Sequence, residues 1–275
     1  MYRFGWFSSG RDKAARDLLE VACDSIKGGD IESKISFVFC SRESGESTES
    51  DKFIRLVRSY DIPLVCYSYQ EFKAGKSDSQ PGEPLPQWRL GYDRRVMERL
   101  KEYEPDLSIL AGYMLIVGKE MCRHYDMINL HPAAPGGPAG TWQEVIWQLM
   151  ESRAKETGVM THLVTPQLDK GPVVSYCKFK ITGVPFYAYW QQLEGQSVSR
   201  IKESQGEENP LFKLIRSQGL KREFPLILAT MKAFSFGSVK IAGGRVVGAK
   251  GDTIDGCDLT EEIDKIIKLH PEGGE

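Results

Sequence analysis

The first 165 residues alternate short apolar runs with amphipathic stretches, which predicts strands and helices in turn. The apolar runs are short enough for buried strands and fall at residues 2–8, 35–40, 62–67, 107–113 and 127–130. The stretches with helical spacing fall at residues 12–26, 48–60, 89–103 and 118–124. This order predicts an α/β fold with a doubly wound, mostly parallel sheet.

The remainder of the chain combines one strong helix, further strands and a C-terminal extension. Five apolar residues recur at the spacing of a helix face, namely Trp142, Val145, Ile146, Leu149 and Met150. Residues 73–86 and 181–210 are polar or rich in Gly and Pro, which indicates irregular segments. We expect strands at 161–165 and 173–180, a helix over 211–234 interrupted near Pro225, a hairpin at 238–247 and a short helix from Thr260.

Composition and charge narrow the class of protein. Apolar residues make up 41% and charged residues 27% of the chain, as in an ordinary globular protein. The net charge of −2 gives no electrostatic case for binding nucleic acid or an acidic membrane. No signal peptide or membrane-spanning run is evident. The six cysteines lack zinc-site spacing, so we expect reduced core thiols, no metal and a cytoplasmic protein.

Two side chains suited to acyl transfer lie at the end of a predicted strand, beyond which doubly wound sheets bind ligands. Asn129 and His131 are two residues apart, so strand alternation puts both side chains on the same face. An amide and an imidazole can both donate hydrogen bonds to the oxygen of a tetrahedral intermediate. Asp169, in a turn between two predicted strands, offers a carboxylate to orient the imidazole. Taken alone, this pattern is explained better by a turn-capping Asn and a His bonded to backbone, so the case needs more than these residues.

The residues around this pair resemble the folate-dependent formyltransferase family. Asn129-Leu-His-Pro and the later Gly158-Val-Met-Thr-His-Leu-Val-Thr-Pro-Gln-Leu-Asp-Lys-Gly-Pro-Val-Val are similar to the family's N-I-H-P and G-x-x-V-H-F-V-x-x-x-x-D-x-G-P-V-I. Other segments match in the right order, including Arg89-Leu-Gly-Tyr-Asp-Arg, Ala111-Gly112-Tyr113-Met114 and Phe224-Pro225-Leu226-Ile227. The resemblance covers residues 2–182 and 211–248 and implies a Rossmann-like formyltransferase fold with a C-terminal extension ending in a β-hairpin.

The resemblance also implies roles for individual residues. Asn129, His131 and Asp169 match the family's catalytic residues, and His162 matches a supporting histidine, although it could equally be a buried histidine bonded to Asp169 or backbone. The implied co-substrate is 10-formyltetrahydrofolate, with no metal. The residues implied to line its site are Arg89, Met114, Leu115, Val117, Gln167 and Leu168. Those implied to bind a substrate phosphate are Gly10, Arg11, Asp12 and Lys13.

The chain departs from the family pattern on the side of the acceptor. The family's phosphate loop S-G-x-G-S/T-N reads Ser9-Gly10-Arg11-Asp12-Lys13-Ala14, where Asp12 would either repel a phosphate or cap the helix. The loop at 133–141 also differs, the family's late glutamate falls near Leu220, and residues 186–210 are an insertion. Gln218 or Glu223 could replace the glutamate. These changes leave the identity of the acceptor open.

We expect a single formyltransferase domain over residues 1–275, with a phosphate- and substrate-binding half at 1–126, a catalytic and folate-binding half at 127–255, and a tail at 256–275. The favoured function is formyl transfer to glycinamide ribonucleotide in purine biosynthesis. The alternatives are transfer to another amine, such as an amino sugar or amino acid, hydrolysis of formyltetrahydrofolate, and a sensor that has lost catalysis. The expected partners are small molecules, namely the folate and a phosphorylated amine, without nucleic acid or membrane. A homodimer is permitted but not required.

Overall fold

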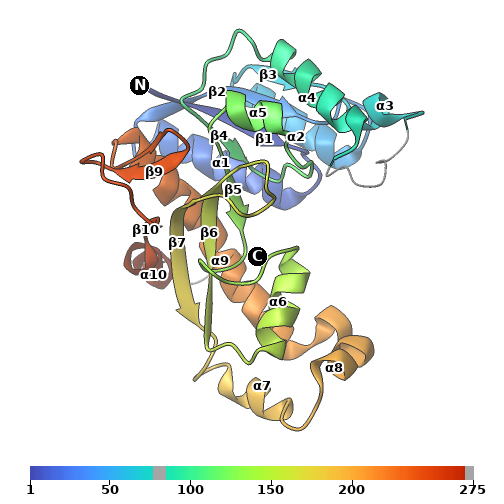
Figure 1. Cartoon of the computed structure of the whole chain (residues 1–275), viewed down its shortest axis with the longest axis vertical. Helices are drawn as coiled ribbons and strands as arrows, with labels where there is room; N and C mark the ends of the chain where they lie inside the picture. The colour runs from blue at the N-terminus through green and yellow to red at the C-terminus, as the bar shows by residue number, and fades with distance from the viewer. Residues whose placement is uncertain (77–84, 270–275) are drawn as a thin grey trace.

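A computed structural model of the chain describes residues 1–76 and 85–269 and is built around one twisted eight-stranded sheet (Figure 1). The strand order is β10-β7-β6-β5-β4-β1-β2-β3, and only the β5–β6 and β6–β7 pairs are antiparallel. The strands are Tyr2–Ser8 (β1), Ser33–Cys40 (β2), Leu64–Cys66 (β3), Leu107–Leu110 (β4), Met127–His131 (β5), Glu156–Leu163 (β6), Val173–Lys180 (β7) and Cys257–Asp258 (β10). This arrangement confirms the predicted mostly parallel α/β fold.

Helices cover both faces of the parallel strands. Helices α1, α2 and α9 pack on one face around Phe4 and Trp6 of β1, and α4 and α5 pack on the other face around Phe7 of the same strand. The alternation of these fully buried aromatic side chains follows from the period of a strand between two helical layers. The helices are Lys13–Lys27 (α1), Thr48–Ser59 (α2), Tyr69–Lys73 (α3), Gln87–Arg99 (α4), Lys119–His124 (α5), Trp142–Glu151 (α6), Tyr187–Gln192 (α7), Val198–Gln205 (α8), Gly206–Glu208 (η1), Pro210–Ser235 (α9) and Thr260–Leu269 (α10).

The prediction of an irregular segment at 181–210 was wrong, because α7, α8 and η1 occupy most of it. These short helices form the lower part of the molecule with α6 and the first half of α9 (Figure 1). Phe186, Leu193 and Ile201 are buried there against α6 and α9. The helices are held by tertiary packing of a few apolar residues, which a polar local sequence conceals.

Helix α9 crosses the molecule from the lower helices to the parallel sheet (Figure 1). The predicted interruption at Pro225 is absent, since the helix continues through this residue. Leu226 packs against β6 and β7 on one side of the helix, and Ile227 and Met231 pack into the core beneath α1. Burial of these side chains compensates for the backbone hydrogen bond that a proline cannot donate.

Smaller differences concern element ends. Strand β4 stops at Leu110, three residues before the predicted end, because Gly112 turns the chain with φ +69. The predicted loop at 73–86 follows the unforeseen helix α3, and its residues 77–84 lie outside the described part of the chain. The predicted C-terminal hairpin is confirmed as Val239–Ala242 (β8) and Arg245–Gly248 (β9), joined by the two glycines expected at its turn.

Gly219 of α9 offers a test of local helix stability. Nothing lies within 4 Å of the position that a Cβ would occupy there, so alanine should add helix propensity without a clash. We expect Gly219→Ala to raise the free energy of unfolding in urea by about 0.5–1 kcal/mol. Gly158→Ala in β6 is the matched control and should destabilise, because its Cβ would lie 2.2 Å from the Cys177 carbonyl oxygen. Equal effects of the two variants would contradict this account.

Candidate active site

The site is assembled where the antiparallel strands β5 and β6 join the parallel sheet. Asn129 of β5 stands opposite His162 of β6, and side chains opposite each other in such a pair share one face. The His131 and His162 rings lie edge to face, with centroids 6.2 Å apart. Strand pairing therefore gathers an amide and two imidazoles that are far apart in the sequence.

A cavity of about 410 Å³ opens beside these residues, at the carboxyl ends of β4 and β5. Its polar lining includes Asn129, His162 and Asp169. Its apolar lining includes the predicted folate residues Met114, Leu115, Val117 and Leu168. Neither Gln167 nor His131 lines it. An apolar cavity with a few convergent polar groups is the form expected of a site for a flat organic ligand.

Asp169 reaches this cavity from the turn between β6 and β7. Its backbone is in the left-handed region with φ +52, and its carboxylate lies 3.5 Å from Nε2 of His162. Gly171 closes the turn, where a Cβ would lie only 1.7 Å from the Leu163 carbonyl oxygen. The carboxylate thus contacts His162, and not His131 as the sequence suggested, because His162 is the ring that faces the cavity.

His162 is buried and is held as a neutral ring. Burial lowers its pKa, and this effect outweighs the hydrogen bond to the Leu163 carbonyl and the attraction of Asp169. Its Nδ1 lies 3.2 Å from that carbonyl oxygen, which can only accept, so Nδ1 carries the proton. Nε2 is then free to accept a proton on the side that faces Asp169.

His131 lies behind the cavity wall and is covered by the loop that departs from the family pattern. Its ring is 3% exposed, and Nε2 donates a hydrogen bond to the Pro138 carbonyl oxygen at 2.9 Å. Gly140 and Thr141 of the same loop and Glu144 of α6 also line the cavity, and sequence reasoning missed these residues as contributors to the site. Thr141 and Glu144 form a capping box, and the T-x-x-E pattern before the apolar helix was the available signal.

Arg89 does not reach the cavity, contrary to the prediction that it lines the folate site. Its side chain is 3% exposed and pairs with Asp93 at 2.5 Å, one helical turn along α4. Asp93 also accepts a hydrogen bond from the Gly118 N–H at 2.7 Å, and burial raises its pKa. A buried guanidinium needs such a partner, so packing between α4 and α5 takes the arginine away from solvent.

The predicted phosphate segment lies at the start of α1. Asp12 is the N-cap and accepts a hydrogen bond from the Ala15 N–H at 3.0 Å. Of the two alternatives given for Asp12, the structure therefore shows helix capping. The nearby cations are also compensated, since Lys13 pairs with Asp17 at 2.6 Å and Arg11 lies 3.4 Å from Asp12. Gly10 has φ +56, which suits the tight turn into the helix.

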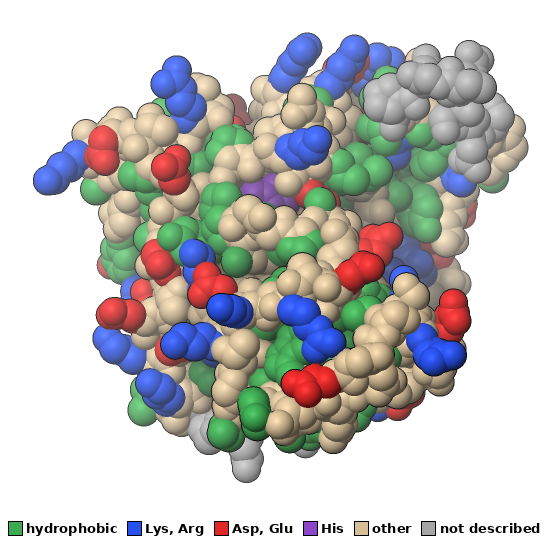
Figure 2. Space-filling model, turned by 60° about the horizontal axis from the view of Figure 1, so that its bottom comes forward, with side chains coloured by type: hydrophobic (Ala, Val, Ile, Leu, Met, Phe, Trp, Pro, Cys, Tyr) green, Lys and Arg blue, Asp and Glu red, His purple; other side chains and the backbone are tan. Residues whose placement is uncertain are grey.

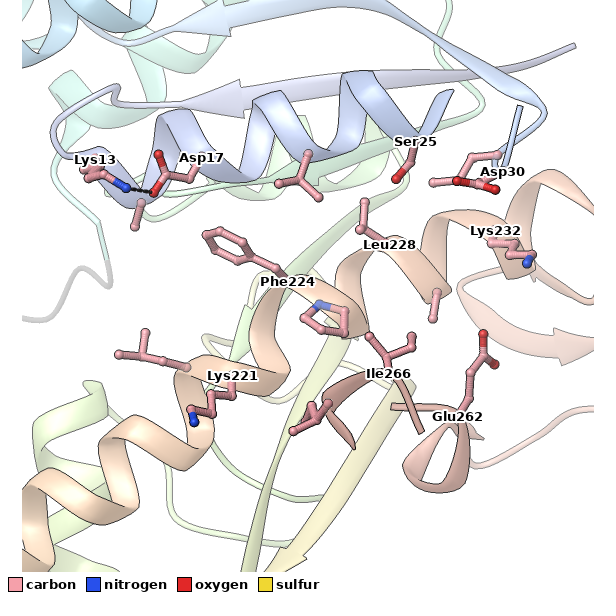
Figure 3. A pocket seen from close by; sticks show the side chains of 17 residues that line it. Lys13, Asp17, Ser25, Asp30, Lys221, Phe224, Leu228, Lys232, Glu262 and Ile266 are labelled. Carbon is pink, nitrogen blue, oxygen red and sulfur yellow. Dashed lines mark hydrogen bonds and ion pairs between the residues drawn. The ribbon is translucent and has the colours of Figure 1, made fainter. Parts of the chain in front are cut away.

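A second cavity, of about 680 Å³, runs between α1, α9 and α10 on the other side of the sheet (Figure 3). Phe224 and Leu228 of α9 point into it, and the Lys13–Asp17 pair stands at one end. Leu220, near which the family's late glutamate is expected, lines it as well. The two candidate replacements are engaged elsewhere, because Glu223 pairs with Arg216 and Gln218 accepts from Arg222.

Other features of the described residues that could indicate a function are the surface charges, groups of possible metal ligands and apolar helices. On the face in Figure 2, a histidine is visible in a central hollow, and below it basic and acidic side chains are interspersed. Within residues 1–76 and 85–269, no group of His, Cys, Asp and Glu is arranged to hold a metal ion. In the same ranges, no helix is both long enough and apolar enough to cross a membrane.

The fold and the site define an α/β protein with an amide, an imidazole and a carboxylate on an apolar cavity at a sheet edge. The formyl transferase family matches residues 17–183, which include Asn129, His131, His162 and Asp169. This chain therefore belongs to the formyl transferase family. The match begins after the predicted phosphate segment, so it does not include Gly10–Lys13.

Individual relatives agree with this assignment. Phosphoribosylglycinamide formyltransferase of Dictyostelium discoideum is 30% identical over 57% of this chain and 74% of its own length, and that of Bacillus subtilis is 28% identical over 64% and 77%. The match to the Escherichia coli enzyme is 33% identical but spans only 44% of that relative. Formyltetrahydrofolate deformylase of Haemophilus influenzae is 25% identical over 45% of this chain and 39% of its own length.

Solved structures share the fold across nearly the whole chain. Glycinamide ribonucleotide transformylase 1 from Symbiobacterium toebii superposes with a TM-score of 0.59 at 22% identity, covering 90% of this chain and 93% of its own. Phosphoribosylglycinamide formyltransferase from Coxiella burnetii gives 0.60 at 19% identity, covering 94% and 98%. These likenesses establish the Rossmann-like formyltransferase architecture.

The Arg89–Asp93 pair gives a stability prediction. Replacing Arg89 with Met leaves a buried carboxylate without its counter-charge, which we expect to cost about 3–5 kcal/mol in urea unfolding. The double variant Arg89→Met/Asp93→Asn should regain most of this loss, because the Asn side chain can still accept from Gly118. If Arg89→Met kept its stability and lost only folate binding, the role expected from the sequence would be correct.

The neutral state of His162 predicts a pH dependence of stability. Its folded pKa lies below the ordinary 6.5, so the unfolded chain takes up a proton first as pH falls. Its contribution is therefore complete above pH 6.5 and is lost as pH falls toward the folded pKa. Urea unfolding on both sides of this pH should show a shallower dependence in His162→Gln. The control is His124→Gln, at an exposed histidine, which should behave as the unaltered chain; a matching change there would refute the assignment.

Proposed function

We propose that this protein transfers the formyl group of 10-formyltetrahydrofolate to an amine, with glycinamide ribonucleotide as the acceptor. The observation that carries the proposal is the placement of Asn129, His162 and Asp169 on one apolar-lined cavity, within the part of the chain that matches the family. The pteridine ring would lie against Met114, Leu115, Val117 and Leu168, whose side chains line that cavity. We place the reaction in the cytoplasm, in keeping with the six free cysteines.

The proposed chemistry assigns a task to each polar group. The acceptor amine attacks the formyl carbon, and the Asn129 amide donates to the oxygen on which negative charge develops. The Asp169–His162 pair takes the proton from the attacking amine, because Nε2 of His162 faces that carboxylate. His131 donates from Nε2 to the same oxygen once this atom exchanges the Pro138 carbonyl for substrate. The Asp169–His162 pair then returns the amine proton to the folate nitrogen as the bond from the formyl carbon to that nitrogen breaks.

The acceptor has one specific alternative. In the main proposal, its phosphate lies at Gly10–Lys13, where the first turn of α1 presents backbone N–H groups and Arg11 and Lys13 add positive charge. However, the Asp12 carboxylate already caps this helix, and the apolar Leu220 lies near the position expected for the family's late glutamate. Both observations favour an amine without a phosphate as the second candidate. The match to deformylases makes water a third acceptor to be tested.

One assay separates these acceptors. The purified protein is given 10-formyltetrahydrofolate with glycinamide ribonucleotide, with the dephosphorylated riboside, or with no amine, and the change in pterin absorbance is followed. Turnover that requires the ribonucleotide supports the main proposal, and equal turnover with the riboside supports an amine without phosphate. Turnover without any amine identifies a hydrolase, and a protein that does not bind the folate would refute the proposal.

Substitutions test the proposed roles. We expect His131→Ala to lower kcat by about 10²–10⁴-fold and Asn129→Ala by about 10²–10³-fold, with little change in folate affinity. The matched control is His124→Ala, since this exposed histidine lies on α5 away from the cavity lining and should leave kcat unchanged. Full turnover in His131→Ala would overturn the mechanism.

A further inference from the structure

Two cysteines meet at the carboxyl end of the sheet in a way that the proposed chemistry does not use. Cys40 ends β2 and Cys66 ends β3, and the two residues are direct partners in the register of these parallel strands. In-register side chains of neighbouring strands lie on the same face, and here both pack toward α1 and α2. The two thiols lie close enough to shift each other's pKa in opposite directions.

The two thiols have opposite surroundings. Cys40 is fully buried, and its interaction with Cys66 together with burial raises its pKa. Cys66 is only half-buried, and its interaction with Cys40 lowers its pKa. Arg58 also lowers this pKa, whereas Glu43 and Glu46 raise it. Burial is the largest effect on the other four thiols, and it raises the pKa of each. These are Cys23, Cys122, Cys177 and Cys257.

We propose that Cys66 and Cys40 form a peroxide-sensitive thiol pair, in which Cys66 reacts with a hydroperoxide and Cys40 resolves the product as a disulfide. Neighbouring strands are about 4.8 Å apart, within the Cα separation of about 4.4–6.8 Å that a disulfide needs. A half-buried thiolate beside a resolving thiol is the arrangement typical of redox-sensitive cysteines.

The reaction balances with hydrogen peroxide as the oxidant. The Cys66 thiolate attacks one peroxide oxygen and becomes a sulfenic acid, while hydroxide leaves. The Cys40 sulfur then attacks the Cys66 sulfur, the S–S bond forms, and the sulfenic oxygen leaves as water with the Cys40 proton. In total the two thiols lose two electrons and two protons, and the peroxide is reduced to two water molecules.

The pair is connected to the folate cavity through three serine contacts. Ser41, next to Cys40, donates from its N–H to the Ser8 carbonyl oxygen and from Oγ to Ser9 Oγ, each at 3.0 Å. Ser9 Oγ accepts from the Met114 N–H at 3.1 Å, at the cavity lining. A disulfide that draws Cys40 toward Cys66 displaces Ser41 and weakens this support of Met114. This consequence rests on the proposed function, whereas the disulfide itself does not.

The test begins with the full-length, reduced protein and hydrogen peroxide. After treatment, free thiols are alkylated, and the protein is digested without reductant and analysed by mass spectrometry. We expect a Cys40–Cys66 linked peptide pair and two fewer alkylated thiols. Cys40→Ala should leave Cys66 as a sulfenic acid trapped by dimedone, and Cys23→Ala should keep the linked pair. An unreacted Cys66, a Cys66 sulfinic acid beside intact Cys40, or earlier oxidation of another cysteine would overturn the proposal.

Folate binding gives the second readout. Binding of folate, followed by fluorescence quenching, should be about tenfold weaker in the oxidised than in the reduced protein. Cys66→Ser should bind equally well before and after peroxide. If the disulfide forms and the affinity stays the same, the connection through Ser41 is wrong. If the reduced protein binds no folate while the disulfide still forms, the proposed function fails and the thiol chemistry stands.

Discussion

The register of β5 against β6 is the constraint on which the candidate site depends. It sets Asn129 opposite His162, and a slip of one residue would turn one of these side chains to the other face of the sheet. The pairing of β6 with β7 shifts between Thr161 and His162, and bulges of this kind re-aim a side chain next to a site. The geometry of the candidate site is thus held by backbone hydrogen bonds between strands.

Each imidazole of the site has one ring nitrogen in contact with a backbone carbonyl oxygen. His162 has its Nδ1 proton bound to a carbonyl and turns Nε2 toward Asp169, whereas His131 has its Nε2 proton bound to Pro138. The two imidazoles therefore differ in which ring nitrogen is bound to a carbonyl: Nδ1 in His162 and Nε2 in His131. The loop at 133–141, which differs from the family pattern, supplies the Pro138 carbonyl oxygen that accepts from His131. The altered loop is therefore in direct contact with the family-like Asn129-Leu-His-Pro motif.

The fold was predictable from the sequence because its parallel strands are apolar and its helices amphipathic, and the central elements lie where these patterns place them. The lower helices were not predictable, because residues such as Leu193 and Ile201 become a core only when α6 and α9 are adjacent. The sequence placed Asn129 and Asp169 near one strand end but paired Asp169 with His131, whereas the β5–β6 register brings His162 to that carboxylate. The burial of Arg89 was not predictable, because its partner Asp93 and the Gly118 backbone meet it only in three dimensions.

Helix α9 has 26 residues and is therefore about 39 Å long, with one end among the lower helices and the other beneath α1. A rotation of the lower helices relative to the sheet would have to bend this helix, because it packs in both parts of the molecule. Pro225 is the position where bending breaks the fewest hydrogen bonds, because no amide proton is present there. Pro225 lines the second cavity, so such a bend would change the width of that cavity, on the side of the sheet away from the candidate site.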